Sequence, residues 1–552
     1  MIRGIVATIE IAFLGALILA TRCANYQDVF VGGNIYFVDA DCYARMTRVK
    51  MCAAKPGLIL RHHDFENFPE GTTSHTTAPF DYLILALSSV IVAARPAVAR
   101  ANNFGVAPYH LDLAGAFISP LLALFGGWFL WWWSRRMGFR YRWMMLILYA
   151  ISPILVHGTE LGRPDHQSLL ILLVTIAICA EWSLQMKAAD QPSPRGYGLA
   201  STAASTEQNR WAVVSGGTWG LAIWVSAYEP LLIFLVVTAT TFLVSRAALL
   251  GRNRRAEWIS LAAVVAIALL IERRVPPIAI FQSTPSFENW ARTIGELAHL
   301  SPVNPVWFRW CGFLLLVAPL LIWMNVRTKK DGARGLHALP VCVLLIATYL
   351  LTLWQVRWAY FFVLLFALAL PALFEPIKWR IAVWIVFVLS IFPILRDWDQ
   401  KLWPSEEQLM SRMEKRIESV QIRELALSLR SSDVQPFLAP WWLSPSIAYW
   451  SGQPGVAGSS HESLDGIQDS AQFFLSEDLQ RAREILQKCR AAWVFAYDSE
   501  RVAQNSAAIV NEQVPLHPLC RVLDRTPSQA PRFLIFFAQN SACKLYRVSI
   551  ER

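Results

Sequence analysis

Charged residues are scarce in this chain. Only 16% of its 552 residues are Asp, Glu, Lys or Arg, and 55% are hydrophobic. A soluble globular protein usually contains about 25% charged residues. The shortage argues against an ordinary soluble protein and indicates long segments that face lipid, in agreement with a mean hydropathy of +0.38.

The nine cysteines lack the C-x-x-C spacing of zinc-binding modules, so a cysteine zinc site is not expected. Two pairs, Cys42 with Cys52 and Cys520 with Cys543, could form disulfides in an oxidising compartment. Free thiols are the alternative. The sequence also has no internal repeat and no Gly-rich nucleotide-binding loop.

Apolar segments long enough to cross or nearly cross a bilayer recur through the first 395 residues. They lie near residues 5–21, 113–133, 143–158, 168–185, 211–227, 229–248, 257–272, 306–325, 338–355, 358–375 and 378–395. A shorter apolar run, 82–94, is expected to lie in the outer interface. If it crossed fully, the strongly basic loop 134–140 would fall outside the cell.

Positive charge is concentrated in short loops. The net charge of +10 is compatible with nucleic acid, but the Lys and Arg residues gather between apolar runs. We interpret them as topology signals at an anionic inner leaflet, and we expect no nucleic-acid binding. The basic loops 134–140, 246–255 and 327–334 then fall inside. The loops that fall outside are 22–112, 158–167 and 273–305.

The composition changes near residue 396. Charged helical patterns alternate there with apolar β-like runs, which predicts one mixed α/β domain over 396–552. Residues 1–395 are expected to form a multi-span α-helical membrane domain with roughly eleven spans. The predicted location is the cell (inner or plasma) membrane, with the C-terminal domain extracytoplasmic.

Three acidic motifs fall in the external loops. They are the D-A-D of Asp39 and Asp41, the G-R-P-D-H-Q run with Asp165, and the T-I-G-E run ending at Glu296. Carboxylates that converge at a membrane surface suit a hard cation such as Mg²⁺ or Mn²⁺. Taken singly, each has a plainer interpretation. The D-A-D lies in a solvated loop or pairs with Arg45 or Arg48, Asp165 pairs with Arg163, and Glu296 is an ordinary surface residue.

Other polar residues accompany these acids. His166 and Gln167 directly follow Asp165 and would assist as ligands. Arg357 at the outer end of a span either snorkels to the interface or binds phosphate, for which a guanidinium fork is suited. Glu229, before Pro230, is expected in a structural turn. The Ser459–Ser463 cluster is read mainly as a polar loop.

These motifs, in this order, resemble those of oligosaccharyltransferase catalytic subunits of the single-subunit bacterial and archaeal type, within the GT-C superfamily of membrane glycosyltransferases. The similar runs are D-A-D-C-Y-A-R-M at 39–46, F-E-N-F-P-E-G at 65–71, G-R-P-D-H-Q at 162–167, T-I-G-E at 293–296 and R-W-A-Y at 357–360. The resemblance spans nearly the whole chain. It favours a retained first span over a cleaved signal peptide, because the first catalytic loop would follow that span.

The resemblance implies roles for individual residues. Asp41, Asp165, Gln167 and Glu296 would hold Mn²⁺ or Mg²⁺, supported by Asp39 and His166. Asp41 and Glu296 would also orient the acceptor amide, and Arg357 with the metal would stabilise a lipid diphosphate leaving group. The implied activity is an inverting transfer of a glycan from a polyprenyl-linked donor to a protein, without a sugar nucleotide.

One family motif departs from the pattern. Where relatives have W-W-D-Y-G, this chain has Trp441 and Trp442 followed by Leu443, Ser444 and Pro445. Both tryptophans would bind the acceptor, but leucine cannot accept the hydrogen bond that grips the Ser or Thr of a sequon. The alternatives are therefore the same donor with a non-sequon acceptor (a lipid, a polysaccharide or another peptide) and, ranked last, a transporter or flippase.

Overall fold

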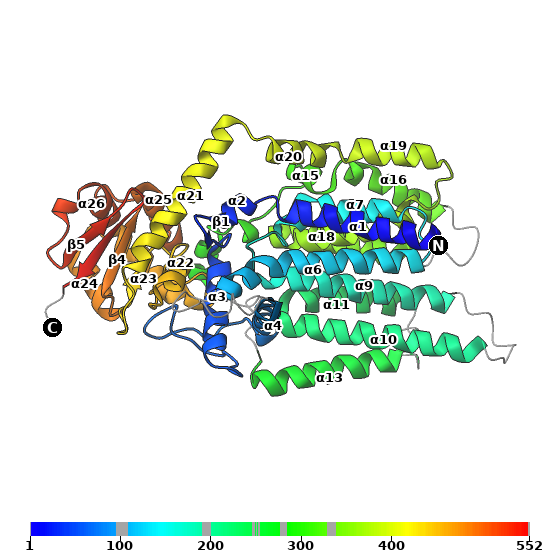
Figure 1. Ribbon diagram of the computed structural model, residues 1–552, viewed down its shortest axis with the longest axis horizontal. Coiled ribbons are helices and arrows are strands. Elements are labelled where there is room, and N and C mark those ends of the chain that lie inside the picture. Colours follow the sequence, from blue (N-terminus) through cyan, green and yellow to red (C-terminus); the bar gives the residue numbers. More distant parts are fainter. Residues whose placement is uncertain are drawn as a thin grey trace.

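Long helices laid side by side make up most of the molecule. The computed structural model describes residues 2–94, 109–189, 200–244, 249, 251, 254–275, 284–327 and 338–549. The helices run along the longest axis, and a smaller unit containing a β-sheet lies at one end of them (Figure 1). The N-terminus lies at the opposite end of the bundle.

In the described residues, each predicted apolar segment is helical. The bundle helices are α1 (Ile2–Arg22), α6 (Tyr109–Arg136), α7 (Arg142–Ile151), α8 (Pro153–His157), α9 (His166–Ala189), α10 (Ala200–Val225), α11 (Tyr228–Val244), α13 (Arg255–Glu272), α15 (Val306–Cys311), α16 (Leu314–Arg327), α17 (Ala338–Trp354), α18 (Ala359–Phe374), α19 (Arg380–Ser390) and α20 (Phe392–Leu402).

Fewer helices meet a strict criterion for a membrane span. Four in the described part are long and apolar enough, and a fifth counts if the pair α19 and α20, bent by 46°, is one span. Five shorter apolar helices have 10–17 residues. The count of roughly eleven spans therefore stays a prediction. The bundle exterior exposes large apolar side chains, such as Leu243 (82% exposed) and Ile381 (78%), as expected of helices that face lipid.

The segment after α1 builds a platform across the end of the bundle. It contains α2 (Tyr26–Val29), the strand pair β1 (Phe30–Val31) and β2 (Asn34–Ile35), α3 (Ala40–Ala54) and α4 (Ala78–Ala94). Asp39 caps α3 by accepting a hydrogen bond from the Cys42 amide at 3.0 Å. In Figure 1, α3 and α4 lie across the direction of the bundle helices, between them and the sheet.

Two short segments complete the external loops. The α13–α15 connection carries α14 (Pro285–Ala291) and the 3₁₀ turn η3 (Gly295–Leu297). Another 3₁₀ turn, η5 (Val356–Trp358), joins α17 to α18. Backbone hydrogen bonds tie the two turns, because the amide of Val356 donates to the carbonyl of Ala298 at 3.1 Å.

The C-terminal unit is mixed α/β. Its four-stranded sheet has the order β3-β4-β6-β5, with β3 parallel to β4 and the other pairs antiparallel. Its elements are α21 (Glu406–Leu427), β3 (Phe437–Leu438), α22 (Ser444–Ser451), η6 (His461–Ser463), α23 (Leu464–Leu475), α24 (Leu479–Lys488), β4 (Trp493–Tyr497), α25 (Ser499–Val510), α26 (Leu519–Arg525), η7 (Pro527–Gln529), β5 (Leu534–Gln539) and β6 (Cys543–Val548).

The platform and the C-terminal unit share one apolar core. α3 packs against α22, where the ammonium of Lys50 lies 3.2 Å from the centroid of the Tyr449 ring. The hydroxyl of Tyr449 donates to Asp112 at the start of α6. The unit is therefore anchored to the loops of the bundle.

All nine cysteines are free, so neither disulfide pairing occurs. Cys42 and Cys52 both lie on α3, ten residues apart. A helix rises 1.5 Å per residue, which separates them by about 15 Å, too far for a disulfide. The alternative of free thiols is the one that the structure adopts.

Candidate active site

The predicted acidic residues meet in one cavity. A cavity of about 250 Å³ lies where the bundle loops meet the C-terminal unit. Its wall includes six predicted site residues, namely Asp41, Asp165, His166, Gln167, Glu296 and Arg357. Asp39, Trp441 and Trp442 lie outside this wall.

Backbone pairing joins the first two motifs. The amide of Val38, next to the D-A-D, donates to the carbonyl of Gly162 at 3.0 Å. Gly162 has φ +76°, and an added Cβ would lie 2.7 Å from the Val29 side chain, so the motif requires glycine here. The Arg163 guanidinium then pairs with the Asp39 carboxylate at 2.6 Å, whereas Arg45 and Arg48, the partners considered for the D-A-D, both pair with Asp81. These contacts hold the two loops together beneath the cavity.

Asp41 lies in the first turn of α3 and faces the other acids. Its side chain is accessible to water through the cavity that it lines. Desolvation within the cavity, followed by the neighbouring carboxylate of Asp39, raises its pKa well above the usual value. Asp165 and Glu296 add to this repulsion. A cluster of this kind favours an added positive charge.

The side chains of Asp165 and Gln167 differ in whether all their polar atoms have hydrogen-bond partners. Asp165 pairs with His166 Nδ1 at 2.7 Å rather than with Arg163, and His166 lowers the pKa of Asp165 against the desolvation that would raise it. Gln167 donates from Nε2 to Glu229 at 3.4 Å. Its Oε1 is buried and has no hydrogen-bond partner, although its residue lines the cavity. That oxygen is available to a ligand.

A directional chain of hydrogen bonds supports Glu296. Arg163 donates to His157 Nε2 (3.0 Å), so the neutral imidazole carries its proton on Nδ1 and donates to the Tyr360 oxygen (2.8 Å). The Tyr360 hydroxyl then donates to Glu296 Oε1 at 3.2 Å. Since Arg163 also holds Asp39, this chain connects Asp39 to Glu296. Burial is the main cause of the raised pKa of Glu296.

Arg357 is held in place by Glu229, which the sequence places in a structural turn. Its guanidinium pairs with Glu229, whose side chain is fully buried at the start of α11. Its carbon Cζ also lies 5.5 Å from the centroid of the Tyr228 ring. The Nε of Arg357 has no hydrogen-bond partner. A guanidinium positioned this way, at a cavity wall, can receive an anionic oxygen.

The loop that carries Glu296 is docked on the C-terminal unit. Trp290 of α14 is buried in a small apolar cluster, and its ring centroid lies 6.0 Å from that of Trp441. Trp441 Nε1 donates to Asn505 at 2.8 Å. Trp442 packs edge-on against Trp441 and Tyr497. Trp441 thus packs against the loop of Glu296, and acceptor binding by the two tryptophans stays a prediction.

The predicted carboxylates do not close into a cage in this conformation. Among the described residues, one group of three His, Cys, Asp or Glu side chains has ligand atoms all within 4.8 Å, and it is His75, His461 and Glu462. Nonetheless, the acidic wall fits a hard cation. Asp41, Asp165 and Glu296 supply carboxylate oxygens, and the unpartnered oxygen of Gln167 supplies a neutral one.

Several residues of the site lacked a clear sequence signal. Neither Glu229 nor Tyr360 has a sequence signal of its own that indicates a role in the site, although Tyr360 belongs to the R-W-A-Y run. His75 lies in an unremarkable polar stretch before α4. His461 and Glu462 were part of the polar Ser459–Ser463 run, which was the only hint. Desolvation lowers the pKa of His461 to about 4, so this imidazole is neutral at pH 7.

Glu66 also reaches the cavity from the platform. It is 3% exposed, and its carboxylate accepts from the Ser459 amide at 3.5 Å. Burial raises its pKa to about 7. This acid therefore links the platform to the C-terminal unit within the wall of the cavity.

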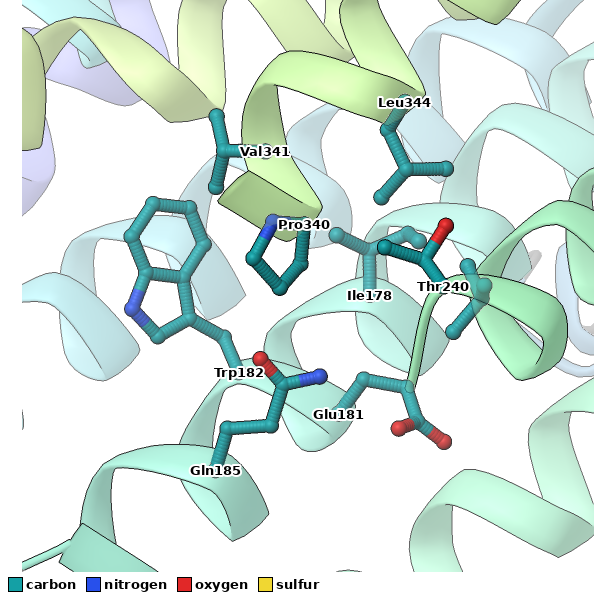
Figure 2. Close-up of a pocket in the computed structure, with 9 residues that line it drawn as sticks. Ile178, Glu181, Trp182, Gln185, Thr240, Pro340, Val341 and Leu344 are labelled. Atoms are coloured by element: carbon teal, nitrogen blue, oxygen red, sulfur yellow. The ribbon is translucent and has the colours of Figure 1, made fainter. Parts of the chain in front are cut away.

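A second cavity, of about 30 Å³, lies among α9, α11 and α17 (Figure 2). Its lining is mostly apolar, with Trp182 and Leu344 on facing helices. The one carboxylate there, Glu181, already pairs with Arg254 at 2.7 Å and accepts from Ser215 at 2.7 Å. The cavity lined by the acidic residues and Arg357 is therefore the candidate active site.

No family model and no curated protein sequence matches this chain. Its fold is nevertheless that of the GT-C membrane glycosyltransferases, because solved structures of that class align with 98% of its length. Four of its described helices are long and apolar enough to cross a membrane, in agreement with this fold.

Three solved structures illustrate the similarity. The oligosaccharyltransferase of Archaeoglobus fulgidus, tethered to an acceptor peptide with the NVT sequon, matches with a TM-score of 0.67 and 14% identity over 74% of its own chain. The archaeal oligosaccharyltransferase AglB from the same organism, in complex with an inhibitory peptide and a dolichol-phosphate, matches with a TM-score of 0.66 and 14% identity. ArnT from Cupriavidus metallidurans, bound to undecaprenyl phosphate, matches with a TM-score of 0.53 and 10% identity over 97% of its chain.

Proposed function

We propose that this protein is a metal-dependent glycosyltransferase that moves a glycan from a polyprenyl (di)phosphate donor to an acceptor on the outer face of the cell membrane. One observation carries the proposal. Acidic residues from three separate loops line one cavity together with Arg357, in a fold shared with an enzyme solved with dolichol-phosphate. We place the C-terminal unit on the extracytoplasmic side.

Each residue of the wall has a role in this proposal. Asp41, Asp165, Gln167 and Glu296 would hold Mn²⁺ or Mg²⁺, which when bound would supply positive charge against the donor phosphates. Arg357, fixed by Glu229, contacts the leaving (di)phosphate. Asp41 and Glu296 orient the acceptor nitrogen towards the anomeric carbon. As the C–N bond forms, the bond from the anomeric carbon to the phosphate oxygen breaks with inversion, and a carboxylate takes the proton from nitrogen.

The favoured acceptor is a protein, through an Asn linkage. The similarity to the A. fulgidus enzyme with its tethered sequon peptide supports it. A second acceptor class, a non-sequon peptide, lipid or polysaccharide, is favoured by Leu443. Its side chain is only 9% exposed and offers no hydrogen bond to a Ser or Thr.

A transfer assay on purified protein tests the proposal. The wild type should transfer glycan from a polyprenyl diphosphate donor to a peptide only when Mn²⁺ or Mg²⁺ is present. Asp41→Ala and Glu296→Gln should each lower the rate at least about 1000-fold, roughly 4 kcal/mol of transition-state stabilisation. Asp28→Asn, in the exposed α2, is the control and should keep full activity.

Full activity in both site variants would refute the catalytic assignment. To separate the acceptor classes, the glycoproteins of cells with and without the gene can be compared by mass spectrometry. Loss of Asn-linked glycans supports the protein acceptor. If donor turnover is present in vitro and the glycoproteome is unchanged, the acceptor is of the second class.

A further inference from the structure

The strongest unassigned cluster lies on the wall of the cavity contributed by the C-terminal unit. His75 comes from the platform, and His461 and Glu462 come from η6. The Glu462 carboxylate lies 2.7 Å from His75 Nδ1 and 3.5 Å from His461 Nδ1. The two imidazole centroids are 4.9 Å apart. Three residues with ligand chemistry thus converge from two distant parts of the sequence.

The cluster leaves polar atoms without partners. His461 Nε2 and Glu462 Oε2 are both buried and make no hydrogen bond. The side chain of Glu462 is 9% exposed and that of His461 is 10% exposed. Buried polar atoms usually have a partner, so unsatisfied atoms in a cluster of this kind call for one. Both histidines line the cavity, so a small ligand can reach them.

We propose that His75, His461 and Glu462 form a binding site for a Zn²⁺-type transition-metal ion, separate from the acidic set of Asp41 and Asp165. Two imidazole nitrogens and one carboxylate oxygen suit zinc, whereas Mg²⁺ and Mn²⁺ prefer oxygen ligands alone. Three protein ligands leave at least one coordination position open.

The location gives the ion a structural consequence. His75 precedes α4 in the platform, whereas His461 and Glu462 belong to the C-terminal unit. A bound ion would therefore cross-link these two parts at the cavity wall. The two parts already share an apolar core, and His75 Nδ1 is hydrogen-bonded to Glu462, so the ion would add a coordination link to existing contacts. Zinc binding should accordingly raise thermal stability by mass action.

The test measures zinc binding, so its outcome is independent of glycosyl transfer. Full-length protein in detergent is stripped with a chelator, and Zn²⁺ is titrated in competition with a chromophoric chelator. The wild type should bind one equivalent that His461→Ala and Glu462→Gln each weaken by more than about tenfold. His62→Ala is the matched control. His62 is an exposed histidine of the same platform segment, outside the cluster, and its variant should bind as the wild type does.

Two further measurements separate this zinc site from the acidic wall and identify its ligands. Asp41→Ala should retain the zinc equivalent, which separates this site from the acidic wall. X-ray absorption of the zinc-loaded protein should show two imidazole ligands. Glu462→Gln preserves side-chain shape, and size-exclusion chromatography checks that the variants are folded. Equal zinc affinity in wild type, His461→Ala and Glu462→Gln, or an absorption spectrum without imidazole, would overturn the proposal.

Discussion

The two walls of the cavity are built in different ways. On the bundle side, charged groups already have partners: Arg357 is paired with Glu229, and Asp165 with His166. On the C-terminal side, His461 is a neutral imidazole at pH 7, and unpartnered atoms occur on both walls: Arg357 Nε and Gln167 Oε1 on the bundle side, His461 Nε2 and Glu462 Oε2 on the C-terminal side. Groups that are paired before a ligand arrives need little reorganisation, and this is how electrostatic stabilisation is most effective. Under the proposed function, the paired charges of the bundle wall are the groups placed for the donor phosphates.

The largest effect on stability is expected from removing the ion pair that holds Arg357 in the bundle wall. Glu229→Gln removes the buried partner of Arg357 and leaves its guanidinium uncompensated. Removing one member of a buried ion pair costs about 3 kcal/mol of folding stability when the other member is partly exposed. The midpoint of thermal unfolding should fall markedly. Glu500→Gln, which alters an exposed ion pair, is the control and should cause no measurable change. An unaltered midpoint in Glu229→Gln would show that the pair does not hold this wall.

The next largest effect is a pH dependence of stability caused by Glu66, which lies between the platform and the C-terminal unit. Its pKa is about 7 in the folded protein, above the value of 4.5 for an exposed Glu, because burial favours the neutral form. Folded protein therefore binds this proton more tightly than unfolded protein. The stabilising contribution is complete below pH 4.5 and is lost as the pH rises through 7, with a maximum of about 3 kcal/mol. Glu66→Gln should reduce the loss of stability between pH 6 and pH 8, measured as thermal midpoints across that range. Equal pH profiles for both proteins would contradict this.

A smaller effect, on kcat, is expected from removing the hydroxyl of Tyr360 in the bundle wall. Tyr360→Phe keeps the ring beside His157 but removes the hydroxyl that donates to Glu296. Loss of a hydrogen bond to a charged group costs about 1.5 kcal/mol, which corresponds to roughly a tenfold lower kcat. KM for the donor should change little, because Arg357 is untouched. Transfer kinetics with saturating acceptor measure both values, and a kcat equal to wild type would remove the relay from the proposed mechanism.

The smallest effect is expected at the edge of the C-terminal wall. Trp441→Phe retains an aromatic contact with Trp290 but loses the hydrogen bond to Asn505. The loop of Glu296 should dock less firmly, which raises KM for the acceptor by a few-fold, on the order of 1 kcal/mol. Asn505→Ala should have the same effect if docking is the cause. If Trp441→Phe instead abolishes acceptor binding while Asn505→Ala does not, Trp441 contacts the acceptor directly.

Some features could be read from residue order because they depend on local patterns. The apolar runs predicted the bundle helices, and the change in composition near residue 396 predicted strands and helices in the tail. Asp41, Asp165 and Glu296 were singled out by their polar loops between spans, and they line one cavity. Glu229 was missed because an acid next to Pro230 has the same local signature whether it lies in a turn or pairs with an arginine 128 positions away.

The sequence by itself determined which segments are helical, which loops carry the acids, and that much of the surface must face lipid, because hydropathy and helix periodicity act over a few turns. Only the tertiary structure decided which charges are partners. It paired Arg163 with Asp39 and Arg357 with Glu229, and it brought His75 to Glu462 across 387 positions. Such contacts depend on how distant segments pack, and the free energy of a buried charge depends on the partner that packing supplies.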